Sequence, residues 1–439
     1  MSNLNQHIQA LLDQLALDNH FPPYLYNFRS RVFDPDKDSV YYAGPYWDQE
    51  ELMAILASVL GGQWLAAGER VREFEQAFSR MFHVGHSVMV NSGSSANLVM
   101  VQGIKKYYEW DDQDEIILSP VGFPTTIAPV VQSGLKPVFC DIDSETLDLD
   151  VRQIESVVTP RTRALFISPV LGNSPDMDQL RALTQRYGIA LLLDNCDSLG
   201  SRWDGRYLSD YALASSCSFY PAHHITTGEG GMVSSSNRGL IDLVRSLASW
   251  GRDCTCVGKV NLSPNGACGH RFDRWLPLYD GVIDHKYIYS NMGYNLKPLD
   301  LQGAVGLAQL KKFPEIFQKR RLHKGQIQAL FARYVPDCRF LDERNDKAQT
   351  SWFGVAIQCS DGTFKERLCA HLEGNRIQTR NYFAGNILLH PGYAHLGQAA
   401  DFPHANEVLK TVFFVGCSPS YTHEVMHYLE RVLKEFGNR

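Results

Sequence analysis

Two hydrophobic patterns alternate along the first three hundred residues. Apolar residues recur at helical spacing in 52–60 and again in 177–187, where Ser174-Pro-Asp precedes the run as a helix start. Between such stretches lie short apolar runs without a period of two, which is the pattern of strands buried on both faces. These runs are Glu115–Leu118, Pro137–Cys140, Ala164–Ser168 and Ala190–Asp194. The alternation predicts an α/β protein with a mostly parallel sheet and helices on both sides.

The pattern changes at about residue 300. A long helical run covers 301–334, strand-like runs become fewer, and an amphipathic stretch at 424–436 closes the chain. Near the other end, 21–28 is rich in aromatic residues and proline and is expected to lie on a surface. We therefore expect an N-terminal arm at 1–45, a large ligand-binding domain at 46–300 and a smaller C-terminal α+β domain at 301–439.

Composition and charge narrow the class of protein. A length of 439 residues favours more than one domain, and 44% apolar with 21% charged residues is the balance of a soluble globular chain. The net charge of −6 and the lack of a basic stripe argue against nucleic acid as a partner. No apolar stretch approaches the roughly 18 residues that span a bilayer, and the N-terminus has no signal-peptide features. We expect a cytoplasmic protein without a membrane partner, whose ten cysteines are reduced thiols rather than disulfides.

Candidate ligand-binding residues stand at the carboxyl ends of the predicted strands, where parallel sheets bind their ligands. In Asn91-Ser-Gly-Ser-Ser-Ala-Asn97, Gly93 permits a tight turn, and Ser94 and Ser95 open a helix. A helix N-terminus of this kind attracts an anion, but a serine-rich N-cap without a ligand has the same sequence. The motif alone leaves both interpretations open.

Two further strand ends carry suggestive side chains. Asp194 closes an otherwise aliphatic strand, so its carboxylate is expected to be buried and to meet a cation or a protonated ring nitrogen. Phe123, in the motif GFPTT, can lie against a flat ligand or simply pack within the protein. The segment Ser218–Met232, SFYPAHHITTGEGGM, is too particular in composition for a generic loop.

Taken in order, the motifs SGSSAN, GFPTT, LDNCD, SFYPAHHITTGEGG and GYNLKPLDLQ resemble those of the DegT/DnrJ/EryC aminotransferase-fold family, whose members act on nucleotide-linked keto-sugars. The resemblance covers nearly the whole chain and implies a pyridoxal phosphate enzyme of fold type I, with an aspartate-aminotransferase-type large domain. In the family's aminotransferases, a lysine of the fourth motif forms an imine with the cofactor. His223 stands at that position here. An imidazole cannot form the imine, and this exchange is the mark of the family's sugar 3-dehydratases.

The resemblance also implies a cofactor and roles for individual residues. The cofactor is pyridoxamine phosphate without a covalent bond to the protein, and His223 is its acid/base, with His224 as the alternative base. Asn295 would reach the cofactor phosphate of a neighbouring subunit, which implies a homodimer, and Arg380 is a candidate contact to the substrate diphosphate. The matching cofactor residues are Gly93, Ser94, Ser95 and Ser218 at the phosphate, Phe123 on the pyridine ring, Asp194 at the ring nitrogen, and Asp197 beside the cofactor.

Four cysteines form a candidate metal site. Cys254-Thr-Cys256 and Cys268 lie in the Gly-, Pro- and Asn-rich stretch 252–270, and Cys196 follows Asp194 by two positions. Four thiolates suit a 2Fe–2S centre or a structural zinc, and the residues alone leave both open. The spacing of the first three cysteines resembles that of the family's iron–sulfur dehydratases, although the gap before Cys268 is longer here. That resemblance implies a 2Fe–2S cluster with these four ligands.

The expected activity follows from the resemblance. We expect a lyase that removes the 3-hydroxyl of a nucleotide-linked 4-keto-6-deoxyhexose in 3,6-dideoxysugar biosynthesis, with electrons passing through the cluster from a separate flavin or iron–sulfur reductase. Two alternatives stay open. One is a cluster-free dehydratase of the same fold that glutamate re-aminates, and the other is a non-catalytic protein of this fold with structural zinc.

Overall fold

A seven-stranded sheet forms the centre of the computed structural model, which describes residues 2–17, 33–62, 64–254, 256 and 269–438. In spatial order the strands are β1 (His86–Val90), β9 (Gly231–Ser235), β8 (Ala214–Ser218), β5 (Ala190–Asp194), β4 (Thr162–Ile167), β2 (Glu115–Leu118) and β3 (Lys136–Phe139). Neighbours from β8 to β3 pair in parallel, and only β9 runs antiparallel to both of its neighbours. The prediction of a mostly parallel sheet is confirmed.

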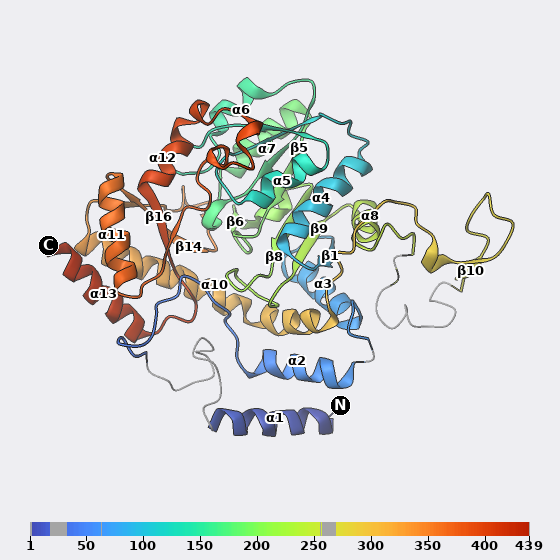
Figure 1. The fold of residues 1–439 in the computed structure, drawn as a ribbon, viewed down its shortest axis with the longest axis horizontal. Coiled ribbons are helices and arrows are strands. Elements are labelled where there is room, and N and C mark those ends of the chain that lie inside the picture. Colours follow the sequence, from blue (N-terminus) through green and yellow to red (C-terminus); the bar gives the residue numbers. More distant parts are fainter. Residues whose placement is uncertain (1, 18–32, 63, 255, 257–268, 439) are drawn as a thin grey trace.

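Helices cover both faces of this sheet (Figure 1). One face packs against α4 (Gly93–Tyr107), α5 (Pro124–Gln132) and α8 (Arg238–Ala248), and the other against α6 (Val151–Val157) and α7 (Met177–Tyr187). In β5, Leu192 packs in the apolar core on the side of α4, α5 and α8, while Leu191 and Leu193 pack in the core on the side of α6 and α7. Both faces are apolar because both are buried, which is why the predicted strands show no alternation.

A long helix joins the two ends of the molecule. Helix α10 (Asp300–Tyr334) packs against α3 (Glu69–Met81) and α2 (Gln49–Gly61) near its start and against α13 (His423–Gly437) near its end. Lys312 on α10 makes an ion pair of 2.6 Å with the fully buried Glu51 on α2. Because α10 contacts elements on both sides of residue 300, the domain boundary there stays a prediction.

The C-terminal part contains a second, antiparallel sheet. Its spatial order is β12 (Cys338–Phe340), β14 (Gly354–Cys359), β16 (Val412–Gly416) and β15 (Thr379–Asn381). Helices α11 (Gly362–Gly374), α12 (Pro403–Thr411) and α13 pack on it and share one apolar core with it. This arrangement is of the α+β kind that the sequence pattern predicts.

The N-terminal region holds a helix that was not predicted from the sequence. Helix α1 (Ser2–Leu17) packs on α2, and the two lie side by side below α10 in Figure 1. Further along, Val40 forms a parallel bridge with Ile377 of the C-terminal part. The aromatic-rich stretch 21–28 lies outside the described residues, so the surface arm stays a prediction.

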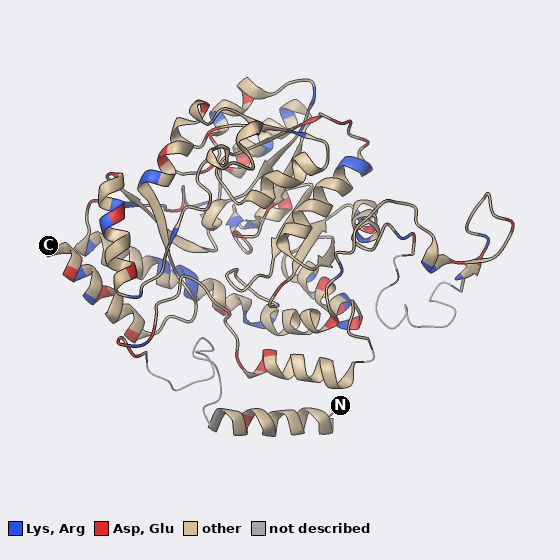
Figure 2. Ribbon diagram, in the orientation of Figure 1, with Lys and Arg blue, Asp and Glu red and all other residues tan. Residues whose placement is uncertain are grey.

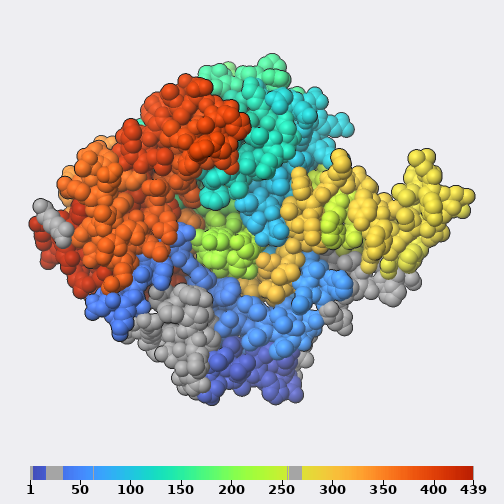
Figure 3. All heavy atoms as spheres, viewed as in Figure 1, coloured from blue at the N-terminus to red at the C-terminus, as the bar shows by residue number. Residues whose placement is uncertain are grey.

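A hairpin protrudes from the body on the side of α8 (Figures 1 and 3). It contains β10 (Phe272–Asp273) and β11 (Ile283–Asp284). The remaining short elements are β6 (Arg202–Trp203), β7 (Arg206–Tyr207), β13 (Ala348–Gln349) and the 3₁₀ turns η2 (Val170–Gly172), η3 (Leu208–Tyr211), η4 (His285–Tyr287), η5 (Ile387–Leu389), η6 (Ala394–Leu396) and η7 (Ala399–Asp401). Charges of both signs are scattered over the ribbon in Figure 2. Among the helices described, none has the length and apolar character needed to cross a bilayer.

Candidate active site

The carboxylate of Asp194 is fixed at the end of β5 by two helices. Its Oδ2 accepts hydrogen bonds from Asn97 Nδ2 on α4 at 2.8 Å and from Thr126 Oγ1 on α5 at 2.7 Å. Its Oδ1 accepts one from the backbone N–H of Cys196 at 3.2 Å. A buried carboxylate with fixed orientation and further acceptor capacity on Oδ1 suits a protonated ring nitrogen.

The start of α4 comes unusually close to the end of β8. A Cβ added to Gly93 would lie 2.4 Å from Cβ of Ser218, so only glycine fits there. Ser92 is the N-cap of α4, and its Oγ accepts from the N–H of Ser95 at 3.1 Å. The serine-rich motif therefore contains a true N-cap, and Ser94 is exposed beside it. The structure brings Gly93, Ser94 and Ser218 together at one helix N-terminus, where an anion is favoured.

Phe123 presents an aromatic ring to solvent beside this edge of the sheet. It precedes Pro124, the first residue of α5, and 53% of its surface is exposed. One neighbour is Phe383 of the C-terminal part, with ring centroids 6.3 Å apart in an edge-on arrangement. An exposed ring at the mouth of a site is able to cover a flat ligand.

His223 lies in the loop between β8 and β9, partly buried against the C-terminal part. Its ring centroid is 5.3 Å from that of Phe353, and its Nδ1 is 3.5 Å from Oδ1 of Asp197 without forming a hydrogen bond. Burial lowers the pKa of His223 to about 4, although the nearby Asp194 carboxylate opposes this shift. The imidazole is therefore neutral at pH 7 and able to accept a proton.

Asp197 is protonated under the same conditions. Burial, followed by the nearby carboxylate of Asp194, raises the pKa of Asp197 to about 8. Its Oδ2 accepts a hydrogen bond of 3.3 Å from the backbone N–H of Leu171. Two neutral groups, an acid and an imidazole, thus face each other close to Asp194.

His224 has a different environment from its neighbour. Its Nε2 donates a hydrogen bond of 2.9 Å to the backbone oxygen of Ser351, and only 2% of the residue is exposed. Burial holds the pKa of His224 well below its usual range. This hydrogen bond ties the loop to the C-terminal part, which is a structural contribution. Nδ1 has no hydrogen-bond partner in either histidine, but only that of His223 lies beside Asp197.

The structure does not gather the predicted cysteine ligands into a group. Cys196 is partly buried next to Asp194, and burial raises the pKa of its thiol. Cys254 and Cys256 are partly buried at the base of the protruding hairpin, and Cys268 lies outside the described residues. Within the described part of the chain, no three His, Cys, Asp or Glu side chains are placed to hold a metal ion. The cluster therefore stays a proposal.

Asn295 and Arg380 are both exposed. Asn295 forms a bridge with Ser249, and its Oδ1 accepts from Lys297 Nζ at 2.5 Å. The guanidinium of Arg380 lies 4.3 Å over the ring of Tyr42 and donates to the backbone oxygen of Thr379. Among the residues that the structure describes, no hydrogen bond or ion pair joins either residue to Asp194, so their roles toward a neighbouring subunit and the substrate remain predictions.

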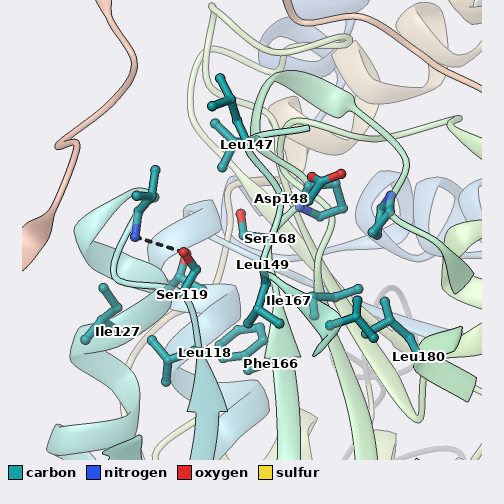
Figure 4. Close-up of a pocket in the computed structure, with 17 residues that line it drawn as sticks. Leu118, Ser119, Ile127, Leu147, Asp148, Leu149, Phe166, Ile167, Ser168 and Leu180 are labelled. Atoms are coloured by element: carbon teal, nitrogen blue, oxygen red, sulfur yellow. Dashed lines mark hydrogen bonds between the residues drawn. The ribbon is translucent and has the colours of Figure 1, made fainter. Parts of the chain in front are cut away.

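A small cavity adjoins the site on the side of α5 (Figure 4). Gly122 and Thr126 line it together with Ser168 and Asp148. Burial raises the pKa of Asp148 to about 7, and Asn173 Nδ2 donates to its Oδ2 at 3.4 Å. Sequence reasoning missed Asp148, which carries no local signal.

Asn97 and Thr126 were also missed from the sequence, although both stand in motifs that supplied other candidate residues. Asn97 closes the motif SGSSAN and Thr126 closes GFPTT, the same motifs that supplied Ser94 and Phe123. Their side chains orient Asp194 rather than face a ligand. A motif residue without an evident ligand is thus a candidate for holding another motif residue in place.

Known proteins identify the family. The model of the DegT/DnrJ/EryC1/StrS aminotransferase family matches residues 47–434. The chain belongs to this family. It is 36% identical over 402 residues to dTDP-4-dehydro-2,6-dideoxy-D-glucose 3-dehydratase of Saccharopolyspora spinosa, covering 90% of this chain and 86% of that protein. The fold type I architecture expected from the resemblance is confirmed.

Two further relatives are similar over most of their length. The lipopolysaccharide biosynthesis protein RfbH of Salmonella typhimurium is 32% identical over 446 residues, covering 99% of this chain and 98% of that protein. Among solved structures, GDP-4-keto-6-deoxymannose-3-dehydratase with a trapped PLP–glutamate geminal diamine has a TM-score of 0.77 and is 28% identical to this chain. The match covers 90% of this chain and 100% of that one.

Proposed function

We propose that this protein catalyses the 3-dehydration of a nucleotide-linked 4-keto-6-deoxyhexose, using pyridoxamine phosphate held without a covalent bond. The proposal rests on His223, a partly buried, neutral imidazole that the resemblance places at the position of the family's imine-forming lysine. Relatives named as 3-dehydratases of dTDP- and GDP-linked keto-sugars support the same reaction class.

The residues around Asp194 suit this cofactor. Asp194 would pair with the pyridine nitrogen, Phe123 would cover the ring, and Ser94 and Ser218 at the start of α4 would bind the phosphate. The fit is supported by the fixed carboxylate, by the close approach that Gly93 permits and by the exposed aromatic ring. When bound, the cofactor supplies an electron sink conjugated with carbon 4 of the sugar.

His223 moves the proton in this mechanism. Because it is neutral at pH 7, its imidazole can take a proton from the methylene carbon of the cofactor as the 3-hydroxyl leaves the sugar. Asp197 faces the ring in its protonated form, so it adds no charge that would hold His223 in the imidazolium state. Asp194 keeps the pyridine nitrogen protonated, which is the condition for the electron sink.

In the proposed route, the product of hydroxyl removal takes up two electrons from outside before a 3-deoxysugar is released. We assign their delivery to a 2Fe–2S cluster on Cys196, Cys254, Cys256 and Cys268, reduced by a separate flavin or iron–sulfur reductase. The cysteine spacing resembles that of CDP-4-dehydro-6-deoxyglucose 3-dehydratase. This assignment places the protein in 3,6-dideoxysugar synthesis for lipopolysaccharide O-antigen, in agreement with its similarity to RfbH.

The active unit is proposed to be a cytoplasmic homodimer in which Asn295 binds the cofactor phosphate of the partner and Arg380 binds the diphosphate of the nucleotide sugar. Both side chains are exposed, as such roles require.

The deciding experiment replaces His223. His223→Lys should form a covalent imine with pyridoxal phosphate, seen as a new absorption band, and should abolish dehydration. His223→Asn should bind pyridoxamine phosphate but lose exchange of its methylene protons with deuterium oxide. Exchange at the wild-type rate in His223→Asn would show that another residue is the base.

A second candidate is the same dehydration without a cluster, with glutamate restoring the amine. It is favoured by the similarity to GDP-4-keto-6-deoxymannose-3-dehydratase, which was trapped with a PLP–glutamate adduct. Protein prepared without air separates the candidates. The cluster predicts iron, labile sulfide and turnover with a reductase, whereas the second candidate predicts turnover with glutamate alone. Zinc without turnover would instead support a non-catalytic protein.

A further inference from the structure

Two thiols face each other across neighbouring strands of the C-terminal sheet. Cys338 on β12 and Cys359 on β14 are paired residue to residue in the antiparallel register. Opposed residues in such a pair have Cα atoms about 4.5–5.5 Å apart, which lies within the range of about 4.4–6.8 Å that a disulfide spans. Their thiols are hydrogen-bonded to each other.

A lysine and a third thiol complete this group, which we call the β12–β14 thiol cluster: Cys338, Cys359, Cys369 and Lys365. Lys365 is buried on α11, and its Nζ donates to the backbone oxygen of Leu409 at 2.6 Å and to Asn381 Oδ1 at 3.4 Å. Both acceptors are uncharged, so the ammonium is available to stabilise a neighbouring thiolate.

The thiols of this cluster differ in character. A hydrogen bond from Cys338 and the charge of Lys365 lower the pKa of Cys359 despite its burial. Burial raises the pKa of Cys369 to about 11, and the hydrogen bond with Cys359, together with burial, raises that of Cys338. The charge of Lys365 favours a thiolate on Cys359, so we assign Cys359 as the nucleophile and Cys338 as the thiol that resolves it.

Both cysteines are buried, so an oxidant reaches them only when the edge of the sheet opens locally. β12 has three residues and is the edge strand next to β14, and Cys338 is its first residue. Short edge strands open locally at low cost, and such an opening exposes both thiols to a molecule the size of hydrogen peroxide.

We propose that Cys338 and Cys359 form a cross-strand disulfide when the protein meets a hydroperoxide. The Cys359 thiolate attacks one oxygen of hydrogen peroxide, the O–O bond breaks, and hydroxide leaves and takes a proton to become water. Sulfur of Cys338 then loses its proton and attacks the sulfenic acid on Cys359, forming the S–S bond and releasing a second water. The two thiols lose two electrons, and the peroxide is reduced to two waters.

The disulfide would close a loop of residues 338–359, which includes residues that contact the two histidines of the candidate active site. Between the two cysteines lie Ser351, whose backbone oxygen binds His224, and Phe353, which contacts His223. Arg320 on α10 also donates to the backbone oxygens of Trp352 and Phe353. Oxidation would therefore tether this segment and raise the thermal midpoint of the protein.

The test maps disulfides in the full-length protein. Protein reduced and prepared without air is treated with increasing hydrogen peroxide, alkylated, and digested without reduction for mass spectrometry. We expect a linked pair of peptides containing Cys338 and Cys359, and a higher thermal midpoint than in the reduced protein. Peptide mapping separates this product from oxidation of the four proposed cluster ligands, so the result does not depend on the proposed function.

Variants assign the two roles. Cys338→Ala should leave a sulfenic acid on Cys359 that dimedone traps, and should abolish the rise in thermal midpoint. The control Cys140→Ala removes a buried thiol of the large domain, whose pKa burial raises to about 12, and should leave the linked peptides in place. The proposal is overturned if the wild-type protein keeps both thiols alkylatable, or if Cys359 is found linked to Cys369 instead.

Discussion

Nδ1 of His223 lies 3.5 Å from Oδ1 of Asp197, and burial moves the pKa values of the two groups in opposite directions. At pH 7 the imidazole is neutral and the acid keeps its proton, so the pair carries no net charge. A base beside a carboxylate would normally be held as the imidazolium, which cannot accept a proton. In the proposed mechanism, this relationship would leave His223 free to act as the base.

Substitution of His224 should affect stability, whereas substitution of the adjacent His223 should affect cofactor proton exchange. His224→Ala should lower the free energy of unfolding by about 1–3 kcal/mol, because it leaves the buried oxygen of Ser351 without its donor. His223→Asn should change stability little, because Nδ1 of His223 has no hydrogen-bond partner and the asparagine amide can replace the bond of the ring to the backbone of Cys196, yet it should abolish cofactor proton exchange. Denaturant unfolding and deuterium exchange on both variants check this, and a large loss of stability in His223→Asn alone would contradict it.

Removing a donor to Asp194 should weaken cofactor binding without unfolding the protein. Asn97→Ala and Thr126→Val each delete one hydrogen bond to Oδ2, which is worth about 1–2 kcal/mol and thus roughly tenfold in the Kd of pyridoxamine phosphate. Thr184→Val serves as the control, because Thr184 donates only to Arg181 within α7. Fluorescence titration measures the affinities, and equal Kd values for all three variants would show that Asp194 does not need these donors.

Gly93 should tolerate no side chain. In Gly93→Ala the new Cβ would meet Cβ and Cα of Ser218, so the start of α4 must move away from β8. We expect the Kd for pyridoxamine phosphate to rise by at least about tenfold, since the phosphate would lose part of its cradle. The matched control is Gly374→Ala, where a Cβ has no neighbour within 4 Å. Unchanged affinity in Gly93→Ala would place the phosphate elsewhere.

The free energy of unfolding should depend on pH through the protonation of the buried carboxyl of Asp148. Its folded-state pKa of about 7 exceeds the unfolded value near 3.9, so the native protein holds a proton there that the unfolded chain releases. The stability that this proton contributes is complete below about pH 4 and is lost as the pH rises to about 7. Asp148→Asn removes this pH dependence. Between about pH 4 and pH 7, the free energy of unfolding of the variant relative to the wild type should therefore rise by up to about 1 kcal/mol for each unit of increasing pH.

Urea unfolding of the cofactor-free protein at several pH values measures that difference. The exposed Asp401 provides the control, because Asp401→Asn makes the same chemical change at the surface. A difference between Asp148→Asn and wild type that does not change with pH would show that the carboxyl titrates alike in both states.

The large sheet was predictable because its strands are buried on both faces and their apolar runs are therefore continuous. Positions such as Ile117 and Leu193 had to be apolar whichever helix layer they meet. Helix α1 was not predicted, since the reading of this region rested on the aromatic stretch at 21–28 and not on the residues before it. Asp148 was unpredictable for a different reason: only the folded chain shows that it lies buried beside a cavity.

The role of Cys254 can be tested without knowing the substrate. Cys254→Ser should remove iron and labile sulfide from protein prepared without air while leaving the Kd for pyridoxamine phosphate unchanged, because serine is a poor ligand for a cluster and Asp194 is held by other groups. Cys417→Ala is the control, since Cys417 is buried in the C-terminal core and donates to the backbone oxygen of Trp352. Retention of the full iron and sulfide content in Cys254→Ser would remove this residue from the ligand set. Loss of iron from both variants would point to general instability and would leave the assignment without support.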